Sequence, residues 1–459
     1  MEKRKRMSKL NIIILAAGKG TRMYSDKPKV LHTIAGKGML QHVVDTSANL
    51  YPSKTISVYG HGGEMVPQSL TQQNASFVIQ EPQLGTGHAV QQALPHLDED
   101  GLTLVLYGDV PLIQQETLKK ILTNETALTL LTQHLDNPKG YGRIVRDTDG
   151  KICSIVEEKD ATPEQRKIQE VNTGILAAPT KHLRNWLANL RNDNAQGEYY
   201  LTDIVAMAVT QGIKIETSQP ANEWEVIGIN NKLQQAELER TWQKELATRL
   251  LLQGVTLADP ARIDIRGELV CEKDVEIDVG CIFEGRVHLG IGVKVGAYSV
   301  IKNSNVAANT QIATYSHIDD AEIGSGCQIG PFARIRPGSK LKNEVHIGNF
   351  VEIKNSDIAN NSKANHLSYI GDATIGSRVN IGAGTITCNY DGANKFRTVI
   401  EDDAFIGSDS QLVAPVTVGR GTTIGAGSTI TKDTPVGGLT LSRSKQLSIP
   451  GWLRPTKKK

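Results

Sequence analysis

The chain has 459 residues, 39% of them hydrophobic and 22% charged, a composition that permits a buried core and excludes wholesale disorder. Its 43 glycines follow no Gly-X-Y period, which excludes collagen, and its formal net charge of +2 gives no basic field that would point to nucleic acid as the main partner. The glycines are unevenly spread, with 18 in residues 1–230 and 23 from Gly267 to Gly438, so we expect two halves built by different local rules.

The chain ends and the cysteines bear on the compartment. The basic run Lys3–Arg6 precedes the apolar run Leu10–Ala17, as in a signal peptide, but this run is short and leads into Gly18–Arg22 without a cleavage segment. The five cysteines include no CxxC pair, so neither a disulfide framework nor a zinc site is indicated. No apolar run reaches the ~18 residues of a membrane span. We therefore expect a cytoplasmic protein without a membrane partner, whose basic ends, Lys3–Arg6 and Lys457–Lys459, are solvated tails.

The first half alternates short apolar runs with helix-like segments, a pattern typical of a mostly parallel sheet. We assign residues 1–230 to an α/β Rossmann-like domain and expect its ligands at the carboxyl ends of the strands. A helix is predicted at Met39–Leu50, and strands are predicted at Ile12–Leu15, Thr55–Tyr59, Ser76–Ile79, Leu102–Leu106 and Ala127–Thr132.

The turn after the first predicted strand, Ala16–Arg22, contains Gly18 and Gly20. Glycines let backbone N–H groups approach phosphate oxygens closely, and Arg22 and Lys29 add positive charge for a polyphosphate. The spacing matches neither GxGxxG nor GxxxxGK[ST], so an ordinary tight turn is the alternative. The preceding strand together with the two basic residues favours the phosphate site.

Asp109 follows the apolar run Leu104–Tyr107 and Gly108. A carboxylate at a strand end can hold Mg²⁺, which takes one or two protein oxygens and leaves its other positions to water and phosphate. The alternative is an aspartate that caps a helix. The second metal oxygen must come from a distant segment, and Asn230 is the candidate because it also follows a strand-like run.

Four further turns are polar and rich in glycine, and they can enclose a base and a sugar, although each alone is an ordinary loop. They are Gln80–His88, Lys139–Arg143, Val156–Lys159 and Val171–Gly174. Together, Leu15–Arg22, Lys29, Gln80–Gly87, Tyr107–Asp109 and Glu157 resemble the sugar-nucleotide pyrophosphorylase family. Its members join a nucleoside triphosphate to a sugar 1-phosphate and release pyrophosphate.

From about residue 265 an aliphatic residue recurs every six residues and is often followed by glycine, as in Ile347-Gly348 and Ile375-Gly376. This period is typical of a parallel β-helix whose triangular coils take 18 residues each, with aliphatic side chains inside and glycine at the corners. The roughly 170 repeating residues give about nine coils at 18 residues each. One-residue slips are predicted at Val306, Ile323 and Ile358.

The repeat is interrupted at Thr387–Phe396, and such insertions often build a binding face. His366, just upstream, suits general-base duty near neutral pH, although a lone histidine is more often structural. Cys388 is a weaker candidate nucleophile, because nothing in the sequence indicates a lowered thiol pKa.

Hexapeptide repeats with a histidine and an extended loop resemble the left-handed β-helix acyltransferases. Fusion to a pyrophosphorylase domain resembles, more closely, the bacterial family of bifunctional N-acetylglucosamine-1-phosphate uridylyltransferases and glucosamine-1-phosphate acetyltransferases. That resemblance implies acetylation of glucosamine 1-phosphate by acetyl-CoA, then uridylyl transfer from UTP to give UDP-N-acetylglucosamine, a precursor of peptidoglycan and lipid A. It also implies a homotrimer, with Mg²⁺ and small-molecule substrates as the ligands.

The resemblance also implies roles for individual residues, with His366, Arg22 and Lys29 catalytic and Asp109 and Asn230 holding Mg²⁺. UTP and the sugar nucleotide would contact Leu15, Ala16, Ala17, Gly18, Lys29, Gln80, Gly85, Thr86, Tyr107, Gly108, Asp109, Gly142, Glu157, Asn172 and Asn230. Glucosamine phosphate would contact Arg336, Lys354, Tyr369, Asn380, Asn389, Tyr390 and Lys395. Acetyl-CoA would contact Ala383, Asn389, Tyr390, Ser408, Ala426 and Arg443.

Residues 231–253 read as a helical linker before the acetyltransferase domain at 254–459. An amphipathic helix is predicted over 231–252, with an apolar face of Leu233, Ala236, Leu238, Trp242, Leu246 and Leu250.

Two other functions remain open. One is a single-activity pyrophosphorylase whose solenoid serves only assembly or allostery, and the other is a non-enzymatic binding or scaffold protein.

Overall fold

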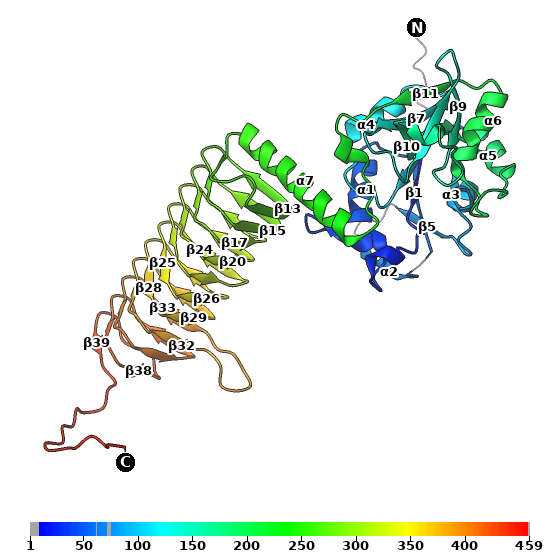
Figure 1. The fold of residues 1–459 in the computed structure, drawn as a ribbon. Coiled ribbons are helices and arrows are strands. Elements are labelled where there is room, and N and C mark those ends of the chain that lie inside the picture. The colour runs from blue at the N-terminus through cyan, green and yellow to red at the C-terminus, as the bar shows by residue number, and fades with distance from the viewer. Residues whose placement is uncertain (1–8, 61, 71–74, 458–459) are drawn as a thin grey trace, which may run out of the picture. The chain divides into compact units, whose positions relative to one another are not determined.

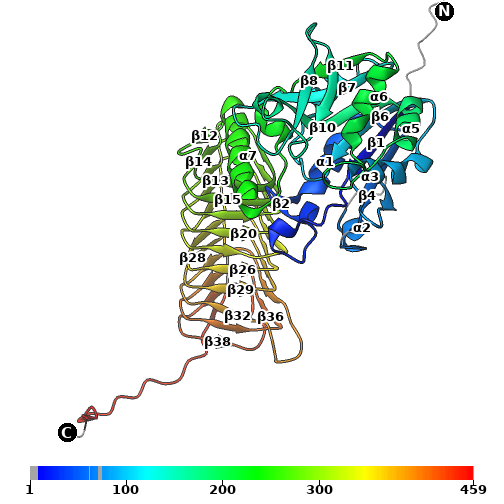
Figure 2. The ribbon, with the colours of Figure 1, turned by 45° about the vertical axis from the view of Figure 1, so that its right-hand side comes forward.

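The computed structural model describes residues 9–60, 62–70 and 75–457 and divides into two compact units, Met1–Trp242 and Gln243–Lys459 (Figures 1 and 2). The predicted N-terminal basic tail, Lys3–Arg6, and the last two lysines lie outside the described residues. No helix among the described residues is long and apolar enough to cross a membrane.

The first unit is built on a nine-stranded sheet that confirms the predicted mostly parallel α/β fold. Strand β10 is antiparallel to β6 and β7, whereas β1, β4, β5 and β6 are mutually parallel. The main path runs β11 (Ile215–Ser218), β7 (Leu128–His134), β10 (Glu170–Pro179), β6 (Gly101–Tyr107), β1 (Lys9–Leu15), β4 (Lys54–Tyr59) and β5 (Ser76–Ile79), with β8 (Gly142–Arg146) and β9 (Ile152–Val156) attached to β10.

Helices cover both faces of this sheet, which is why the run in β1 is apolar at every position. Ile12 and Ile14 join a core formed with α1 (Met39–Ala48), α2 (Met65–Ser69) and α4 (Gln115–Ile121). Ile13 and Leu15 face the opposite core, formed with α3 (Thr86–Ala93), α5 (Thr180–Ala188) and α6 (Ile204–Thr210). Each buried aliphatic side chain contributes about 1.5–3 kcal/mol, so two covered faces fix β1 and the turn that follows it.

The boundary between the units falls within α7 (Lys232–Leu252), which confirms the predicted helix but corrects its predicted apolar face. Leu233 is 69% exposed and Ala236 is also exposed. The buried residues are Leu238, Gln243, Ala247 and Leu250. No single apolar face runs along the whole helix, because the residues that the helix contacts change along its length.

The first half of α7 makes polar contacts with residues 32–35 of the first unit, including Glu239 to the Ala35 N–H at 2.7 Å. In the second half, the Gln243 side chain exchanges two 2.8 Å hydrogen bonds with the backbone of Ile265. Ala247 and Leu250 join the solenoid core. The helix therefore belongs to both units through different side chains.

The second unit is the predicted left-handed parallel β-helix, with all strand pairs parallel and a core of Val, Ile and Leu (Figure 2). A 17-stranded sheet runs from β13 (Ile263–Cys271) to β38 (Thr429–Ile430). An 11-stranded sheet takes in β12 (Thr256–Leu257), β14 (Glu276–Ile277), β16 (Lys294–Val295), β19 (Gln311–Ile312), β22 (Gln328–Ile329), β25 (His346–Asn349), β28 (Lys363–His366), β31 (Asn380–Ile381), β34 (Phe405–Ile406), β37 (Thr423–Ile424) and β39 (Leu439–Thr440). The solenoid starts before residue 265 and is longer than about nine coils.

Most of the glycines that follow the aliphatic repeat residues serve close approach between coils, which corrects the prediction that they turn the corners; Gly330, with a φ of 96°, is an exception. A Cβ at Gly348 would lie 2.0 Å from the Asn365 carbonyl oxygen, and one at Gly324 would lie 2.5 Å from the Lys342 carbonyl carbon. Neither glycine has a positive φ. Many positive-φ corners instead carry other residues, among them Tyr298, Tyr315, Phe332, Phe350 and Leu367.

The one-residue slips predicted at Val306, Ile323 and Ile358 are present, and the strand register reveals a fourth at Ile375. At each, five residues rather than six separate successive core positions. The short corners contain Asn303, Asp320, Asn355 and Asp372, with φ of 44°, 47°, 46° and 49°. Asn and Asp adopt this left-handed conformation more readily than other side chains, so they allow the shortened corners.

A Gly348→Ala substitution is expected to lower the free energy of unfolding by about 1–3 kcal/mol, because the new methyl group overlaps the next coil. Urea unfolding followed by far-ultraviolet circular dichroism measures the change. Gly438→Ala is the matched control in the same unit, since its nearest neighbour, Pro435 Cγ, would lie at an ordinary 3.6 Å. Equal midpoints for the two variants would contradict the close-approach explanation.

Candidate active sites

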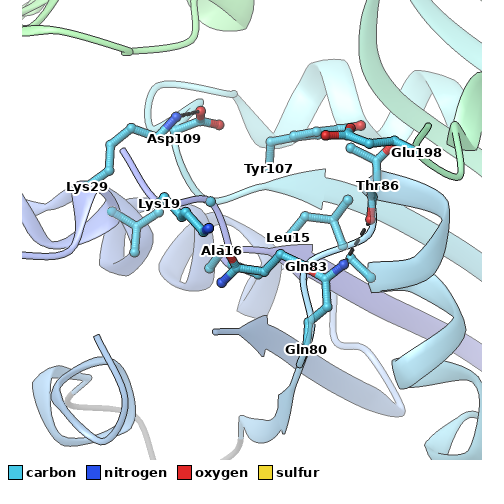
Figure 3. Close-up of a pocket in the computed structure, with 15 residues that line it drawn as sticks. Leu15, Ala16, Lys19, Lys29, Gln80, Gln83, Thr86, Tyr107, Asp109 and Glu198 are labelled. Atoms are coloured by element: carbon cyan, nitrogen blue, oxygen red, sulfur yellow. Dashed lines mark hydrogen bonds and ion pairs between the residues drawn. The ribbon is translucent and has the colours of Figure 1, made fainter. Parts of the chain in front are cut away.

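A cavity of about 420 Å³ lies at the carboxyl ends of β1 and β6 (Figure 3). This volume is within the usual range for small-molecule sites. Ten of the residues predicted for the nucleotide line it, namely Leu15, Ala16, Ala17, Gly18, Lys29, Gln80, Gly85, Thr86, Tyr107 and Asp109. The structure adds Lys19, Val30, Gln83, Ala89 and Glu198. Ligand binding at the strand ends of this fold is therefore sterically possible.

The loop before α3, which contributes to the cavity wall, is held by a side-chain hydrogen bond and by close contact with residues 198–199. The side-chain amide of Gln80 donates to the Gly85 carbonyl at 2.9 Å, and Gly85 has a φ of 108°. A Cβ at Gly85 would lie 2.7 Å from the Tyr199 carbonyl oxygen, so glycine permits this contact with residues 198–199. Glu198 could not be predicted from the sequence, because its segment is irregular and distant along the chain.

Four side chains that the sequence singled out meet beside the cavity, which Lys29 and Asp109 line and Arg22 and Asn230 do not. Lys29 Nζ lies 2.5 Å from Asp109 Oδ2 and 3.2 Å from Asn230 Oδ1, and Arg22 Nη2 lies 3.1 Å from the same Asn230 oxygen. Gly20 allows this arrangement, because a Cβ there would lie 2.6 Å from Lys29 Cβ. We call Arg22, Lys29, Asp109 and Asn230 the charged cluster.

The surroundings of the cluster exclude one alternative and correct one expectation. Asp109 caps no helix, since α4 begins only at Gln115. Asn230 follows no strand; it comes after the short helix η6 (Glu223–Val226). The Ile229 N–H donates to the Asp109 carbonyl at 3.0 Å, and this backbone bond brings the two metal candidates together.

The donor set of the cluster fits Mg²⁺. Asp109 and Asn230 offer a carboxylate and an amide oxygen, and both oxygens already converge on one positive group, Lys29 Nζ. Among the described residues, no group of three or more His, Cys, Asp or Glu could hold a metal. Two protein oxygens suit a magnesium ion that also takes phosphate and water.

The residues predicted for the sugar are contiguous with one another. Asn172 pairs with Gly142 across β10 and β8, and a Cβ at Gly142 would lie 3.4 Å from both Glu157 carboxylate oxygens. Burial raises the pKa of Glu157, and the charges of nearby aspartates add to this, although a hydrogen bond from Thr202 opposes it. Burial, with the charges of Glu157 and Asp109, also raises the pKa of Tyr107, so its phenol stays protonated and can donate.

In the second unit, the register places five residues at the same corner of successive coils. Asn349 pairs with His366 directly. The next coils align at Lys363, Asn380, Phe405 and Thr423, which are paired in that order. The residue three positions after each of these lies at the same corner. Two backbone hydrogen bonds between coils agree with this order: the Asp409 N–H donates to the Ala383 carbonyl at 2.7 Å, and the Gly427 N–H donates to the Ser408 carbonyl at 2.8 Å. The resulting corner column is Asn349, His366, Ala383, Ser408 and Ala426.

The corner column joins the predicted base to three of the predicted acetyl-CoA contacts. Its last three members are small, which leaves room outside the corner for a ligand. Arg443, a fourth predicted contact, approaches the coil corner at Gly427. His366 Nδ1 lies 2.9 Å from Asn349 Oδ1. Because an amide oxygen only accepts, Nδ1 carries the proton and Nε2 is left as the basic nitrogen.

Asp372, which the sequence did not single out, contacts residues predicted for the sugar phosphate. Its carboxylate lies 2.6 Å from Asn355 Nδ2 and 3.5 Å from Lys354 Nζ, and it also accepts a hydrogen bond from Asn389. Burial alone would raise the pKa of Asp372, but these hydrogen bonds and the Lys354 charge together lower it. A buried anion therefore holds two predicted sugar-phosphate residues, Lys354 and Asn389, in place.

The remaining predicted residues lie around this group. Asn389 Nδ2 is 3.5 Å from Tyr369 Oη, and Arg336 pairs with Glu352 at 2.7 Å. Tyr390 and Lys395 face each other across the loop between β32 (Ile386–Cys388) and β33 (Thr398–Ile400), which leaves the solenoid in Figure 1. Asn380 lies on β31, between Lys363 and Phe405.

Burial raises the pKa of the Cys388 thiol, which argues against the weak hypothesis that it is a nucleophile.

Comparisons with known proteins agree with both halves of the fold. Residues 12–146 match the model of the MobA-like NTP transferase domain, residues 265–346 that of the GMPPB C-terminal domain, and residues 397–432 that of the bacterial transferase hexapeptide. The chain is 63% identical to the bifunctional protein GlmU of Nitrosospira multiformis, over 98% of this chain and 99% of that protein. It belongs to the GlmU family.

Other GlmU proteins are similarly close. The chain is 62% identical to that of Cupriavidus pinatubonensis over 98% of its length and 99% of the relative, and 61% identical to that of Azoarcus over 98% and 100%. Like GlmU, the chain is a bifunctional enzyme with a uridylyltransferase and an acetyltransferase activity. This excludes the single-activity and the scaffold alternatives.

Proposed function

We propose that the second unit acetylates glucosamine 1-phosphate with acetyl-CoA, and that the first unit couples the product to UTP to give UDP-N-acetylglucosamine and pyrophosphate. The observation that carries this assignment is the presence in one chain of two separate polar sites, the charged cluster and the corner column. Each site contains the residue types that its reaction requires.

In uridylyl transfer, an oxygen of the sugar phosphate attacks the α-phosphorus of UTP, and the bond to the leaving pyrophosphate breaks in line. Such transfer is promoted chiefly by positioning and by neutralising charge. Arg22 and Lys29 supply positive charge to the phosphates, and the loop from Gln80 to Thr86 lies where the nucleotide would be enclosed. Mg²⁺, held by Asp109 and Asn230, would supply further neutralisation of the triphosphate.

In acetyl transfer, the sugar amine attacks the thioester carbonyl carbon, a C–N bond forms, and the C–S bond breaks to release coenzyme A. His366 Nε2 accepts the proton that the amine loses and can return it to the departing thiolate. Asn349 keeps His366 in the tautomer with a basic Nε2. Lys354, Asn389 and the other residues around Asp372 would hold the sugar phosphate.

The assembly and the compartment are also part of the proposal. A homotrimer fits a solenoid whose corner column has exposed members, His366, Ser408 and Ala426, because a neighbouring copy can then complete the acetyltransferase site. A cytoplasmic location fits the five cysteines, all of which are free. Sedimentation that gave a fully active monomer would contradict the trimer.

The deciding assay supplies glucosamine 1-phosphate, acetyl-CoA, UTP and Mg²⁺, and follows free thiol and pyrophosphate separately. Both are expected to appear, with pyrophosphate depending on prior thiol release when no N-acetylglucosamine 1-phosphate is added. Pyrophosphate formed at full rate without acetyl-CoA would contradict the proposed order of the two reactions.

Asp372→Asn is expected to raise the KM for glucosamine 1-phosphate about tenfold or more, because hydrogen bonds to charged groups contribute about 1.5–3 kcal/mol and the bonds from Lys354 and Asn389 orient the proposed phosphate site. Initial rates of thiol release over a range of sugar concentrations measure this. The kcat and uridylyl transfer are expected to change little. Asp357→Asn, which removes an exposed solenoid carboxylate paired with Arg397, is the control. A fall in kcat alone, without a change in KM, would contradict the positioning role.

A further inference from the structure

The first turn of α7 holds the backbone of Asn230, the proposed metal residue. Asn231 precedes the helix, and its side-chain oxygen accepts from the Gln234 N–H at 2.9 Å. The Gln234 side chain reaches back and accepts from the Asn230 N–H at 2.8 Å. This reciprocal pair is a capping box shifted by one residue, since the returning bond ends on the residue before the cap.

Two successive backbone N–H groups at Asn230, its own and that of Ile229, are therefore fixed by hydrogen bonds. The preceding N–H, of Ile229, donates to the Asp109 carbonyl at 3.0 Å, and the N–H of Asn230 donates to Gln234. The first bond ties Asn230 to the other proposed metal residue, and the second ties it to a helix. Contacts made through its backbone therefore direct the side-chain oxygen of Asn230 at Lys29 and Arg22.

We propose that Gln234 is a positioning residue for the metal of uridylyl transfer. The inference rests on the proposed function, because it takes Asn230 as a metal residue. Gln234 acts through Asn230 and has no direct role in the reaction. Without the Gln234 oxygen, the Asn230 backbone can rotate and its amide oxygen no longer stays opposite the Asp109 carboxylate. Loss of a group that orients a metal ligand typically lowers metal affinity by 10–100-fold.

The test uses Mn²⁺ as the probe and the full chain with saturating UTP. Binding is measured from the relaxation rate of water protons, which reports protein-bound Mn²⁺ without turnover. Gln234→Met, which keeps the length of the side chain but removes the acceptor, is expected to raise the Mn²⁺ Kd by about 10-fold or more. Gln234→Glu, which keeps an acceptor oxygen, is expected to remain within about threefold of the wild type.

Gln235 provides a matched control, because it lies in the same turn and its side chain bonds instead to the Thr33 carbonyl at 2.9 Å. Gln235→Met is expected to leave the Mn²⁺ Kd within about twofold. An equal loss in Gln234→Met and Gln235→Met would mean that docking of the helix alone matters, and would overturn the proposal. So would an unchanged Kd in Gln234→Met.

Asn230→Ala separates this inference from the proposed function. It is expected to bind Mn²⁺ more weakly than Gln234→Met. If Asn230→Ala binds Mn²⁺ like the wild type, the metal assignment itself is wrong, and the positioning role falls with it. If Asn230→Ala loses binding while Gln234→Met keeps it, only the role of Gln234 is wrong.

Discussion

Replacement of His366 by Ala is expected to reduce acetyl transfer by about 10²–10⁴-fold, the usual contribution of a positioned general base. The reason is geometric: Asn349 fixes the proton on Nδ1, so that Nε2 alone can take the proton of the attacking amine. Thiol release from acetyl-CoA with saturating glucosamine 1-phosphate measures the effect. Uridylyl transfer, measured as pyrophosphate release with N-acetylglucosamine 1-phosphate, is expected to remain at the wild-type rate.

His317→Ala is the matched control for this change, because His317 is also an exposed histidine on a solenoid strand, β20 (His317–Asp319), but lies outside the corner column. It is expected to keep both activities. Acetyl transfer by the His366→Ala enzyme at a rate near the wild type would show that another group accepts the proton.

Replacement of Asp109 by Ala is expected to lower uridylyl transfer by at least about 10²-fold, the loss typical when an electrostatic stabiliser of the transition state is removed. The variant removes one of two proposed metal oxygens and also leaves Lys29 without its carboxylate partner at 2.5 Å. Pyrophosphate release over a range of Mg²⁺ concentrations measures the loss. The acetyltransferase activity of the same preparation is expected to be unchanged, because its proposed site lies in the second unit.

Asp100→Ala is a suitable comparison, since Asp100 is an exposed acid just before the same strand, β6. It is expected to leave both activities as they are. An Asp109→Ala enzyme with full Mg²⁺-dependent activity would exclude Asp109 as a metal residue. A variant restored to the full rate by high Mg²⁺ would instead indicate weakened metal binding with intact chemistry.

Much of the fold could be predicted because its two halves have local signals of different period. The run Ile12–Leu15 is apolar at every position since helices cover both faces of its strand. The six-residue repeat indicates the solenoid because each strand of a coil must bury an aliphatic side chain in the core. The corners were not predictable in detail, because whether Gly348 turns a corner or makes room for Asn365 depends on the neighbouring coil.

The sites divide in the same way. Arg22, Lys29 and Asp109 stand in short segments whose strand and turn signals are local, so the sequence identifies them directly. Glu198, Gln234 and Asp372 act through contacts with residues brought near by the fold, and nothing in their immediate sequence marks them. Resemblance to a family carries substrate contacts across, but it does not supply the residues that hold those contacts in position.

The corner column also gives the proposed acetyltransferase site a definite length. Neighbouring strands of a sheet lie about 4.8 Å apart, so the three coil steps from His366 to Ala426 span roughly 14 Å in a straight line. A ligand that lies along this line meets the same corner again at every step, with a different side chain each time. In the proposed site, a long and thin ligand would therefore be selected by where its reactive end falls, and a thioester on an arm shorter than this span would stop short of His366.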